Sequence, residues 1–188
     1  MRLHMVTGAP GAGKSTALGA FLALGSSHIA FDVDWLAAPA SELAGRSVYF
    51  DRSTWPAYSH VWFEVLRGVI RNDRVPVLFA PLTEDDVTAY GRPAWCDGIE
   101  WMLLDCDDDV RAARLAGRSW TPARIAEALA DAAALRAGIA TRVDTGRHSP
   151  NAVARRVKRW LPASHSAAAL RPNPDGSDSH DRLAERGS

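Results

Sequence analysis

Lysine is almost absent from this sequence. Only Lys14 and Lys158 stand among the 22 basic residues, and the others are arginines. Acidic residues also number 22, so the formal net charge is zero. Proteins built mainly to hold nucleic acid or an anionic membrane carry an excess of basic charge. The balance therefore argues against nucleic acid as a partner, although a local basic patch stays open.

Cysteines and long apolar runs are also scarce. The two cysteines, Cys96 and Cys106, form neither a metal-binding pair nor a disulfide framework. No apolar run approaches the roughly 18 residues of a membrane span, and the N-terminal segment has no apolar core of signal-peptide length. With 188 residues, 47% of them hydrophobic, we expect one soluble cytoplasmic domain with no membrane association, as a monomer or homodimer.

Short apolar runs alternate with longer helical patterns along the chain, which is typical of βα units around a parallel sheet. We expect strands over residues 3–7, 28–33, 75–79, 99–104 and 139–143. We expect helices over residues 14–24, 107–117, 122–137 and 150–160, and one from residue 54 onward. Residues 35–52 are interpreted as irregular.

The composition changes after residue 162. Residues 163–188 contain no β-branched residue and no Phe, Trp or Tyr, and they are rich in Ser, Ala, Asp and Pro. Such a segment buries too little apolar area to offset its ordering entropy. We therefore predict a domain over residues 1–162 and a disordered C-terminal tail over residues 163–188.

A phosphate-binding loop follows the first predicted strand. The residues fit G-x-x-x-x-G-K-S between a strand and a helix, which is the context that the motif requires. Backbone N–H groups of such a loop point at phosphate oxygens, and the helix adds its positive N-terminal end. We expect Lys14 to reach the β- and γ-phosphates, Ser15 to bind Mg²⁺ and Thr16 to contact the α-phosphate. The predicted nucleotide-binding residues here are Gly8, Ala9, Pro10, Gly11, Ala12, Gly13, Lys14, Ser15 and Thr16.

Two aspartates, Asp32 and Asp34, lie at the end of the second predicted strand. Ligands of open α/β sheets bind at the carboxyl ends of strands, and phosphoryl transfer needs a carboxylate near Mg²⁺ and another near the attacking hydroxyl. On its own, the pair would more often be a solvated strand end. Beside a phosphate-binding loop, the functional interpretation is favoured.

These motifs resemble those of the small P-loop kinases, the group with shikimate kinase, adenylate kinase, gluconate kinase and chloramphenicol phosphotransferase. The resemblance covers about residues 1–161. It implies a three-layer α/β P-loop fold with a five-stranded parallel sheet in the order 2-3-1-4-5. It also implies a role for Asp34 as substrate-orienting residue and candidate base, and for Asp32 in the Mg²⁺ shell. No acid follows the third strand, where many relatives have one, so Asp32 would take that task.

Two later segments extend the resemblance. Arg111, Arg114 and Arg118 lie on one helical face, and the resemblance implies that Arg114 and Arg118 fold over the ATP phosphates from a short lid over residues 117–122. A solvated helix face is the alternative. The loop after the last strand resembles the one that borders adenine in this group, which implies nucleotide contacts from Thr145, Gly146 and Arg147.

The acceptor pocket is expected in residues 35–60, which are rich in aromatic and basic side chains. Aromatic rings stack on cyclic molecules, and a guanidinium binds an anionic group through two hydrogen bonds. We therefore assign Asp34, Trp35, Arg46, Arg52 and Trp55 to the substrate site. The Gly-Gly-Gly substrate signature of shikimate kinase is absent, which counts against shikimate.

The sequence thus predicts an ATP-dependent kinase that phosphorylates a hydroxyl or phosphate of a small cyclic metabolite, such as a nucleoside, nucleotide, sugar or antibiotic. Lys14, Asp34, Arg114 and Arg118 are its predicted catalytic residues, and ATP and Mg²⁺ its cofactors, with GTP open as an alternative donor. Three other functions stay open: a P-loop NTPase that couples hydrolysis to a partner, a nucleotide-binding regulatory protein without turnover, and a polynucleotide-end kinase. The first would need a further acid and an arginine finger, the intact Lys14-Ser15 and aspartate pairs count against the second, and the third would need a basic groove.

Overall fold

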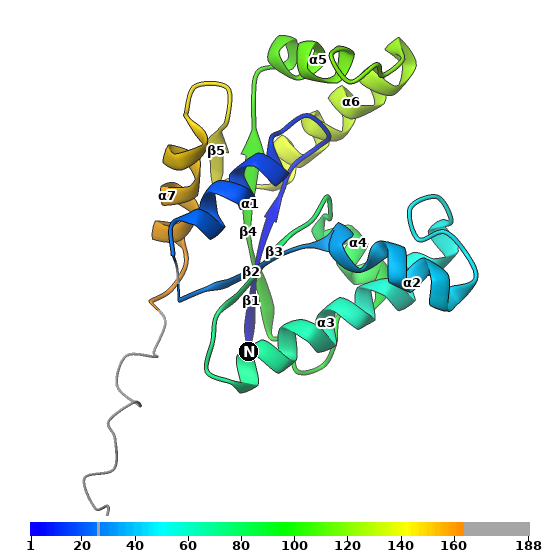
Figure 1. Ribbon diagram of the computed structural model, residues 1–188, viewed down its shortest axis with the longest axis vertical. Coiled ribbons are helices and arrows are strands. Elements are labelled where there is room, and N and C mark those ends of the chain that lie inside the picture. The colour runs from blue at the N-terminus through cyan, green and yellow to red at the C-terminus, as the bar shows by residue number, and fades with distance from the viewer. Residues whose placement is uncertain (26, 164–188) are drawn as a thin grey trace, which may run out of the picture.

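Five parallel strands form the centre of the computed structural model, which describes residues 1–25 and 27–163 (Figure 1). The strands are β1 (Arg2–Thr7), β2 (Ile29–Asp32), β3 (Pro76–Phe79), β4 (Gly98–Asp105) and β5 (Arg142–Asp144). Their order in the sheet is β2-β3-β1-β4-β5, and every neighbouring pair is parallel. The predicted fold and strand order are therefore confirmed. The predicted tail lies, from residue 164 onward, outside the described residues.

Helices cover both faces of the sheet. They are α1 (Lys14–Ala23), α2 (Ala37–Ala44), α3 (Trp55–Arg71), α4 (Glu84–Tyr90), α5 (Asp108–Ala116), α6 (Pro122–Gly138) and α7 (Pro150–Trp160). Figure 1 shows α1 and α7 together on one face and α2, α3 and α4 grouped on the other. No helix of the described residues combines the length and the apolar composition that a membrane span requires.

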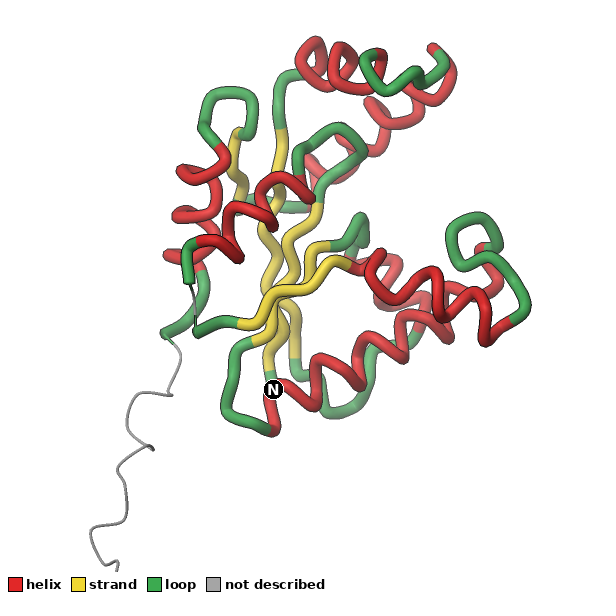
Figure 2. The backbone as a smooth tube through the Cα atoms, in the orientation of Figure 1, coloured by secondary structure: helices red, strands yellow, loops and turns green. Residues whose placement is uncertain are grey.

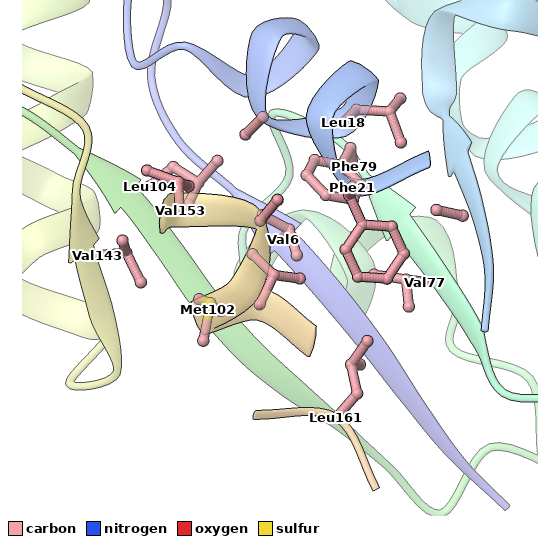
Figure 3. Close-up of a cluster of buried hydrophobic side chains, with 14 of the residues drawn as sticks. Val6, Leu18, Phe21, Val77, Phe79, Met102, Leu104, Val143, Val153 and Leu161 are labelled. Atoms are coloured by element: carbon pink, nitrogen blue, oxygen red, sulfur yellow. The ribbon is translucent and has the colours of Figure 1, made fainter. Parts of the chain in front are cut away.

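Alternate residues of the strands pack on opposite layers. In β1, Val6 faces α1 and α7 in the core cluster of Figure 3, together with Phe21 and Phe79. Its neighbour Met5 belongs to the cluster on the other face, which contains Trp62 of α3. Strands buried on both faces require the near-continuous apolar runs that the sequence shows.

The prediction of an irregular segment over residues 35–52 is wrong. The segment includes the end of η1 (Val33–Leu36) and the whole of α2. Pro39 is the third residue of α2, within the first turn, where its missing N–H leaves no helical hydrogen bond unmade. Gly45 ends the helix in the left-handed conformation, with φ 62°. Pro39 and Gly45 thus mark the two ends of a short helix.

Helix α4 was also missed by the sequence analysis. Its N-terminus is a capping box, in which Thr83 accepts from the Asp86 amide and Asp86 accepts from the Thr83 amide. This short helix follows β3 and packs on α3. Together, α2, α3 and α4 border the region beyond the carboxyl ends of β2 and β3.

The loops that carry the predicted motifs lie at one edge of the sheet. Figure 2 shows loops leaving β1, β4 and β5 on the same side. The phosphate-binding loop follows β1, and the Asp32–Asp34 segment ends β2. Because the strands are parallel, motifs far apart in the chain meet at this edge.

Candidate active site

The phosphate-binding loop has the conformation that its glycines permit. Gly13, at the N-cap of α1, has φ 86°, a left-handed conformation that disfavours any side chain. A Cβ atom on Gly8 would lie 2.5 Å from the carbonyl oxygen of Leu104, so only glycine fits this close to β4. The loop therefore curls tightly between β1 and α1, as the sequence predicts.

Lys14 is partly buried, and its ammonium donates a hydrogen bond to the Gly8 carbonyl across the loop. Burial lowers the pKa of Lys14 to about 8. The nearby carboxylates of Asp32 and Asp34 act in the opposite direction and raise it. The ammonium thus lies in electrostatic contact with both aspartates, although they end a different strand.

A pocket of about 400 Å³ opens beside the loop. It is lined by Gly13 and Thr16 from the phosphate side, by Arg114 and Arg118 from α5 and the turn after it, and by Thr145. The pocket continues to the start of α7, where His148, Pro150 and Val153 line it. A polar end beside the phosphate loop and an end to which Pro150 and Val153 add apolar surface match the two parts of a nucleotide.

Arg114 is tied to the loop itself. Its guanidinium donates to the carbonyls of Gly11 at 3.1 Å and Thr145 at 2.9 Å, and to the Thr145 hydroxyl at 3.1 Å. The same hydroxyl donates to the Ala12 carbonyl at 2.8 Å. In contrast, Arg118 is exposed, and its side chain makes no hydrogen bond or ion pair within the described part of the chain. Arg114 is therefore anchored to the loop, whereas the Arg118 guanidinium lies at the pocket without such an anchor.

The Asp34 segment is held by the aromatic residues of α3. The hydroxyl of Tyr58 and the indole N–H of Trp62, the latter at 3.0 Å, both donate to the Val33 carbonyl. Asp32 accepts a hydrogen bond from the Asp34 amide at 3.1 Å, which caps the η1 turn. Partial burial, together with the charge of Asp32, raises the pKa of Asp34, while Lys14 lowers it.

A second pocket, of about 210 Å³, begins at Asp34. Four aromatic side chains line it: Tyr49, Trp55, Tyr58 and Tyr90. Its other lining residues are the carboxylate of Asp86, Ser59 and the aliphatic Val33, Ala37, Val48, Pro81 and Leu82. The pocket is smaller than the roughly 300–1,000 Å³ of sites for drug-sized ligands, so it suits a single-ring molecule.

Comparison with known proteins adds solved structures only, since no protein-family model and no curated protein matches the sequence. A sugar kinase from Janibacter sp. HTCC2649 has a TM-score of 0.59 at 20% identity. The match covers 86% of this chain and 94% of the sugar kinase. The tunicamycin resistance protein of Deinococcus radiodurans has a TM-score of 0.61 at 13% identity, and the match covers 85% of this chain and 95% of that protein. Shikimate kinase from Aquifex aeolicus vf5 has a TM-score of 0.51 at 17% identity, covering 86% and 96%.

The chain has the fold of the small P-loop kinases. The resemblance predicted from the phosphate-binding loop is confirmed at this level. In this fold, the nucleotide is expected beside the phosphate-binding loop, where the 400 Å³ pocket lies. The 210 Å³ pocket lies beyond β2 and β3, and several of its lining residues belong to residues 35–60, in which the acceptor was expected.

The structure brings some of the predicted acceptor residues together and separates others. Asp34 and Trp55 line the 210 Å³ pocket. Trp35 lies outside its lining, about half exposed, with its ring edge-on to Phe31. Arg46 forms an ion pair with Asp51 at 3.0 Å. The Arg52 guanidinium lies over the Trp55 ring, 5.2 Å from its centroid.

The predicted adenine-side residues also differ in their placement. Thr145 lines the 400 Å³ pocket. The amides of Gly146 and Arg147 are occupied by Asp144, whose carboxylate accepts both at 2.7 and 3.1 Å. The exposed Arg147 side chain pairs with Asp144 and Asp107. His148, to which the sequence analysis gave no role, lines the pocket.

The least expected member of the site is Arg111, which is fully buried. Its guanidinium donates to the carbonyls of Ala9 at 3.4 Å and Pro10 at 2.8 Å, within the phosphate-binding loop. It also forms an ion pair with Asp105 at 2.6 Å. Helical spacing placed Arg111 on the same face as Arg114 and Arg118, but it did not predict that Arg111 would face inward and support the phosphate-binding loop from behind.

Asp105, at the end of β4, joins two arginines. It accepts from Arg136 of α6 at 2.7 Å as well as from Arg111. Burial alone would raise the pKa of Asp105, but the hydrogen bonds from Arg136 and the Cys106 amide and the charges of both arginines outweigh it and lower the pKa. The loop, β4 and α6 are thus joined through one carboxylate.

Replacement of Asp105 by asparagine should destabilise the protein by about 3–5 kcal/mol, because the buried Arg111 guanidinium would lose its counter-charge. For a chain of this size, the melting temperature should fall by roughly 6–20 °C. Because the pKa of Asp105 is lowered in the folded protein, its ionised carboxylate contributes fully to the free energy of unfolding above about pH 4, and this contribution is lost as the pH falls further. The difference in melting temperature between wild type and variant should therefore narrow in acid. Thermal unfolding across pH measures both effects.

The matched control is Glu64→Gln. Glu64 pairs with Arg67 at 3.4 Å on the surface of α3, with 62% of its side chain exposed, and its loss should cost less than about 1 kcal/mol. Equal destabilisation by the two variants would contradict the role assigned to Asp105.

The residues near Lys14 suit Mg²⁺. The described residues contain no group of three or more His, Cys, Asp and Glu side chains placed to hold a metal ion. Mg²⁺ bound with a nucleotide, however, uses few protein ligands and keeps phosphate oxygens and waters. The Ser15 hydroxyl and the Asp32 carboxylate are hard oxygen donors of the kind that it prefers.

The affinity for ATP should fall as the pH rises above about 8. Free Lys14 loses its proton near this pH, whereas bound phosphates would hold the proton to higher pH. Binding above pH 8 therefore takes up a proton and should weaken by up to about tenfold per pH unit. Calorimetric titration with ATP in the absence of Mg²⁺ measures this fall in affinity.

A Lys14→Met variant is the control. It should bind ATP weakly, with an affinity that does not change with pH in this range. An equal pH dependence in both proteins would exclude Lys14 as the group that causes it.

Proposed function

We propose that the protein is an ATP-dependent kinase that transfers the γ-phosphoryl group to a hydroxyl of a small cyclic molecule. The observation that carries this proposal is the position of Asp34. Its carboxylate lines the aromatic acceptor pocket and interacts electrostatically with Lys14 of the phosphate-binding loop. A hydroxyl group placed beside Asp34 would thus lie close to the phosphate that Lys14 binds.

The roles of the residues follow from the chemistry of phosphoryl transfer, in which positioning and charge stabilisation supply most of the acceleration. The loop amides and Lys14 would hold the triphosphate. Ser15 and Asp32 would hold Mg²⁺, which neutralises charge on the phosphates when bound. Asp34 would orient the acceptor hydroxyl and accept its proton. Arg118, which is exposed at the pocket, would close over the transferring group, while Arg114 keeps the loop and Thr145 in place.

Two of the similar structures, a sugar kinase and a shikimate kinase, support a small-molecule acceptor. We extend the proposal to ATP as donor, to Mg²⁺ as cofactor and to a cytoplasmic location. A P-loop NTPase coupled to a partner is the second class of function to be tested, because the phosphate-binding loop by itself would serve hydrolysis equally well.

An ADP-release assay with an acceptor panel tests the proposal. Nucleosides, sugars, aminoglycosides and other hydroxylated metabolites are added singly with ATP and Mg²⁺, and products are examined by phosphorus NMR. We expect ADP release that depends on one class of acceptor and a new phosphate ester. ADP release at the same rate without any acceptor, with inorganic phosphate as the product, would establish an NTPase instead.

A further inference from the structure

The acceptor pocket carries negative charge and no positive charge. Two carboxylates, Asp34 and Asp86, line it, and none of its lining residues is Lys, Arg or His. One oxygen of Asp86 accepts from the Thr83 amide at 2.9 Å and from the Thr83 hydroxyl at 2.7 Å, while its other oxygen accepts from the Tyr90 hydroxyl at 3.4 Å. Burial and the charge of Asp86 raise the pKa of Tyr90, so the phenol stays neutral.

The cations nearest to this pocket in sequence are already engaged. Arg46 is paired with Asp51 and donates to Ser53 at 3.2 Å, on the exposed loop before α3. Arg52 lies over the ring of Trp55. Lys14 and Arg118 belong to the phosphate side, where a nucleotide would use their charge. An anionic acceptor would therefore meet two carboxylates in the pocket with no cation among its walls.

The walls of the pocket suit a cation or a neutral ring. Trp55, Tyr58 and Tyr90 present aromatic surface, on which sugar rings, planar rings and ammonium groups bind. The position of Arg52 over Trp55 is an example within the chain of a cation on one of these rings. Carboxylates beside aromatic faces are the arrangement that favours a protonated amine.

We propose that the acceptor is a neutral or amine-bearing hydroxylated ring compound, and that Asp86, on the α4 wall of the pocket, binds its amine or hydroxyl donors. Sugar acids and phosphorylated compounds are excluded as preferred acceptors. This inference rests on the proposed function for the identity of the pocket as the acceptor site, whereas the charge preference is a property of the pocket itself.

Three single-ring probes of matched shape test the charge preference without turnover: benzylamine, benzyl alcohol and phenylacetate. Each is titrated into the full chain, and the indole N–H of Trp55 and nearby amides are followed by NMR. We expect benzylamine to bind at least about tenfold more tightly than phenylacetate. Asp86→Asn keeps an oxygen for the Thr83 cap and should remove most of this preference. The matched control Asp85→Asn, an exposed neighbour on α4, should leave it unchanged.

Equal or tighter binding of phenylacetate, or no shift of the pocket signals by any probe, would overturn the inference. Phenylacetate binding that disappears in Arg52→Ala would do so as well, because Arg52 would then be an anion anchor. If Asp86→Asn fails to fold, Asp34→Asn should reduce the preference in its place. Failure of the kinase proposal is a separate result: the probes would still bind in the expected order, but no acceptor would stimulate ADP release.

Discussion

Replacement of Lys14 by alanine is expected to lower the turnover number for phosphoryl transfer by about 10²–10³-fold. The ammonium is the cation of the loop itself, and the bound phosphates would lose it where negative charge develops. The fold should survive, because burial already disfavours the charged form of Lys14 in the free protein. Steady-state kinetics measure the loss, and circular dichroism and thermal unfolding report on the fold.

Lys158→Ala is the matched control, since Lys158 is the other lysine of the chain and is exposed on α7. This variant should keep wild-type turnover. A Lys14→Ala protein that is folded and retains more than about a tenth of wild-type turnover would contradict the assignment of the phosphate site.

Replacement of Asp34 by asparagine is expected to lower the turnover number by about 10²–10⁴-fold, the range for loss of a positioned general base. The amide keeps the shape of the side chain but cannot accept the proton of the acceptor hydroxyl. The affinity for ATP should change far less, because Asp34 lies on the acceptor side of Lys14. Turnover with the acceptor found in the ADP-release assay, together with calorimetric titration of ATP, separates the two effects.

Asp73→Asn is the control for loss of a carboxylate elsewhere. Asp73 is exposed in the turn after α3 and has φ 54°, a conformation that asparagine also adopts readily. It should leave both turnover and ATP affinity unchanged. Unchanged turnover in Asp34→Asn would remove Asp34 from the acceptor reaction, and a parallel loss of ATP affinity would place it on the nucleotide side.

The parts of the site that could be predicted from the sequence are local ones. The phosphate-binding loop depends on glycines at fixed intervals between a strand and a helix, so the geometry of residues 8–15 is encoded within the motif. Asp32 and Asp34 could be placed near it because parallel strands end at one edge of a sheet. The order of the strands came from the resemblance to small P-loop kinases, and the sheet confirms it.

The acceptor side was predicted less well. Aromatic and basic residues of 35–60 were assigned as one group, but the structure turns Trp55 toward the pocket and leaves Trp35 outside its lining. The arginines expected to bind an anion are engaged with Asp51 and with the face of Trp55. The pocket wall from α4, with Asp86 and Tyr90, was absent from the prediction. The capping signal at Thr83 and Asp86 could have shown this helix, but nothing local indicated that it borders the pocket.

By itself, the sequence determined the P-loop fold, the phosphate-binding loop and the aspartate pair, because each depends on residues close together in the chain or on the common polarity of parallel strands. Only the tertiary structure decided the charge of the acceptor pocket and the support behind the loop. These depend on which partner each arginine finds: Arg111 is buried between the loop and Asp105, and Arg46 is neutralised by Asp51. Such pairings join segments through space, and helical or strand spacing carries no information about them.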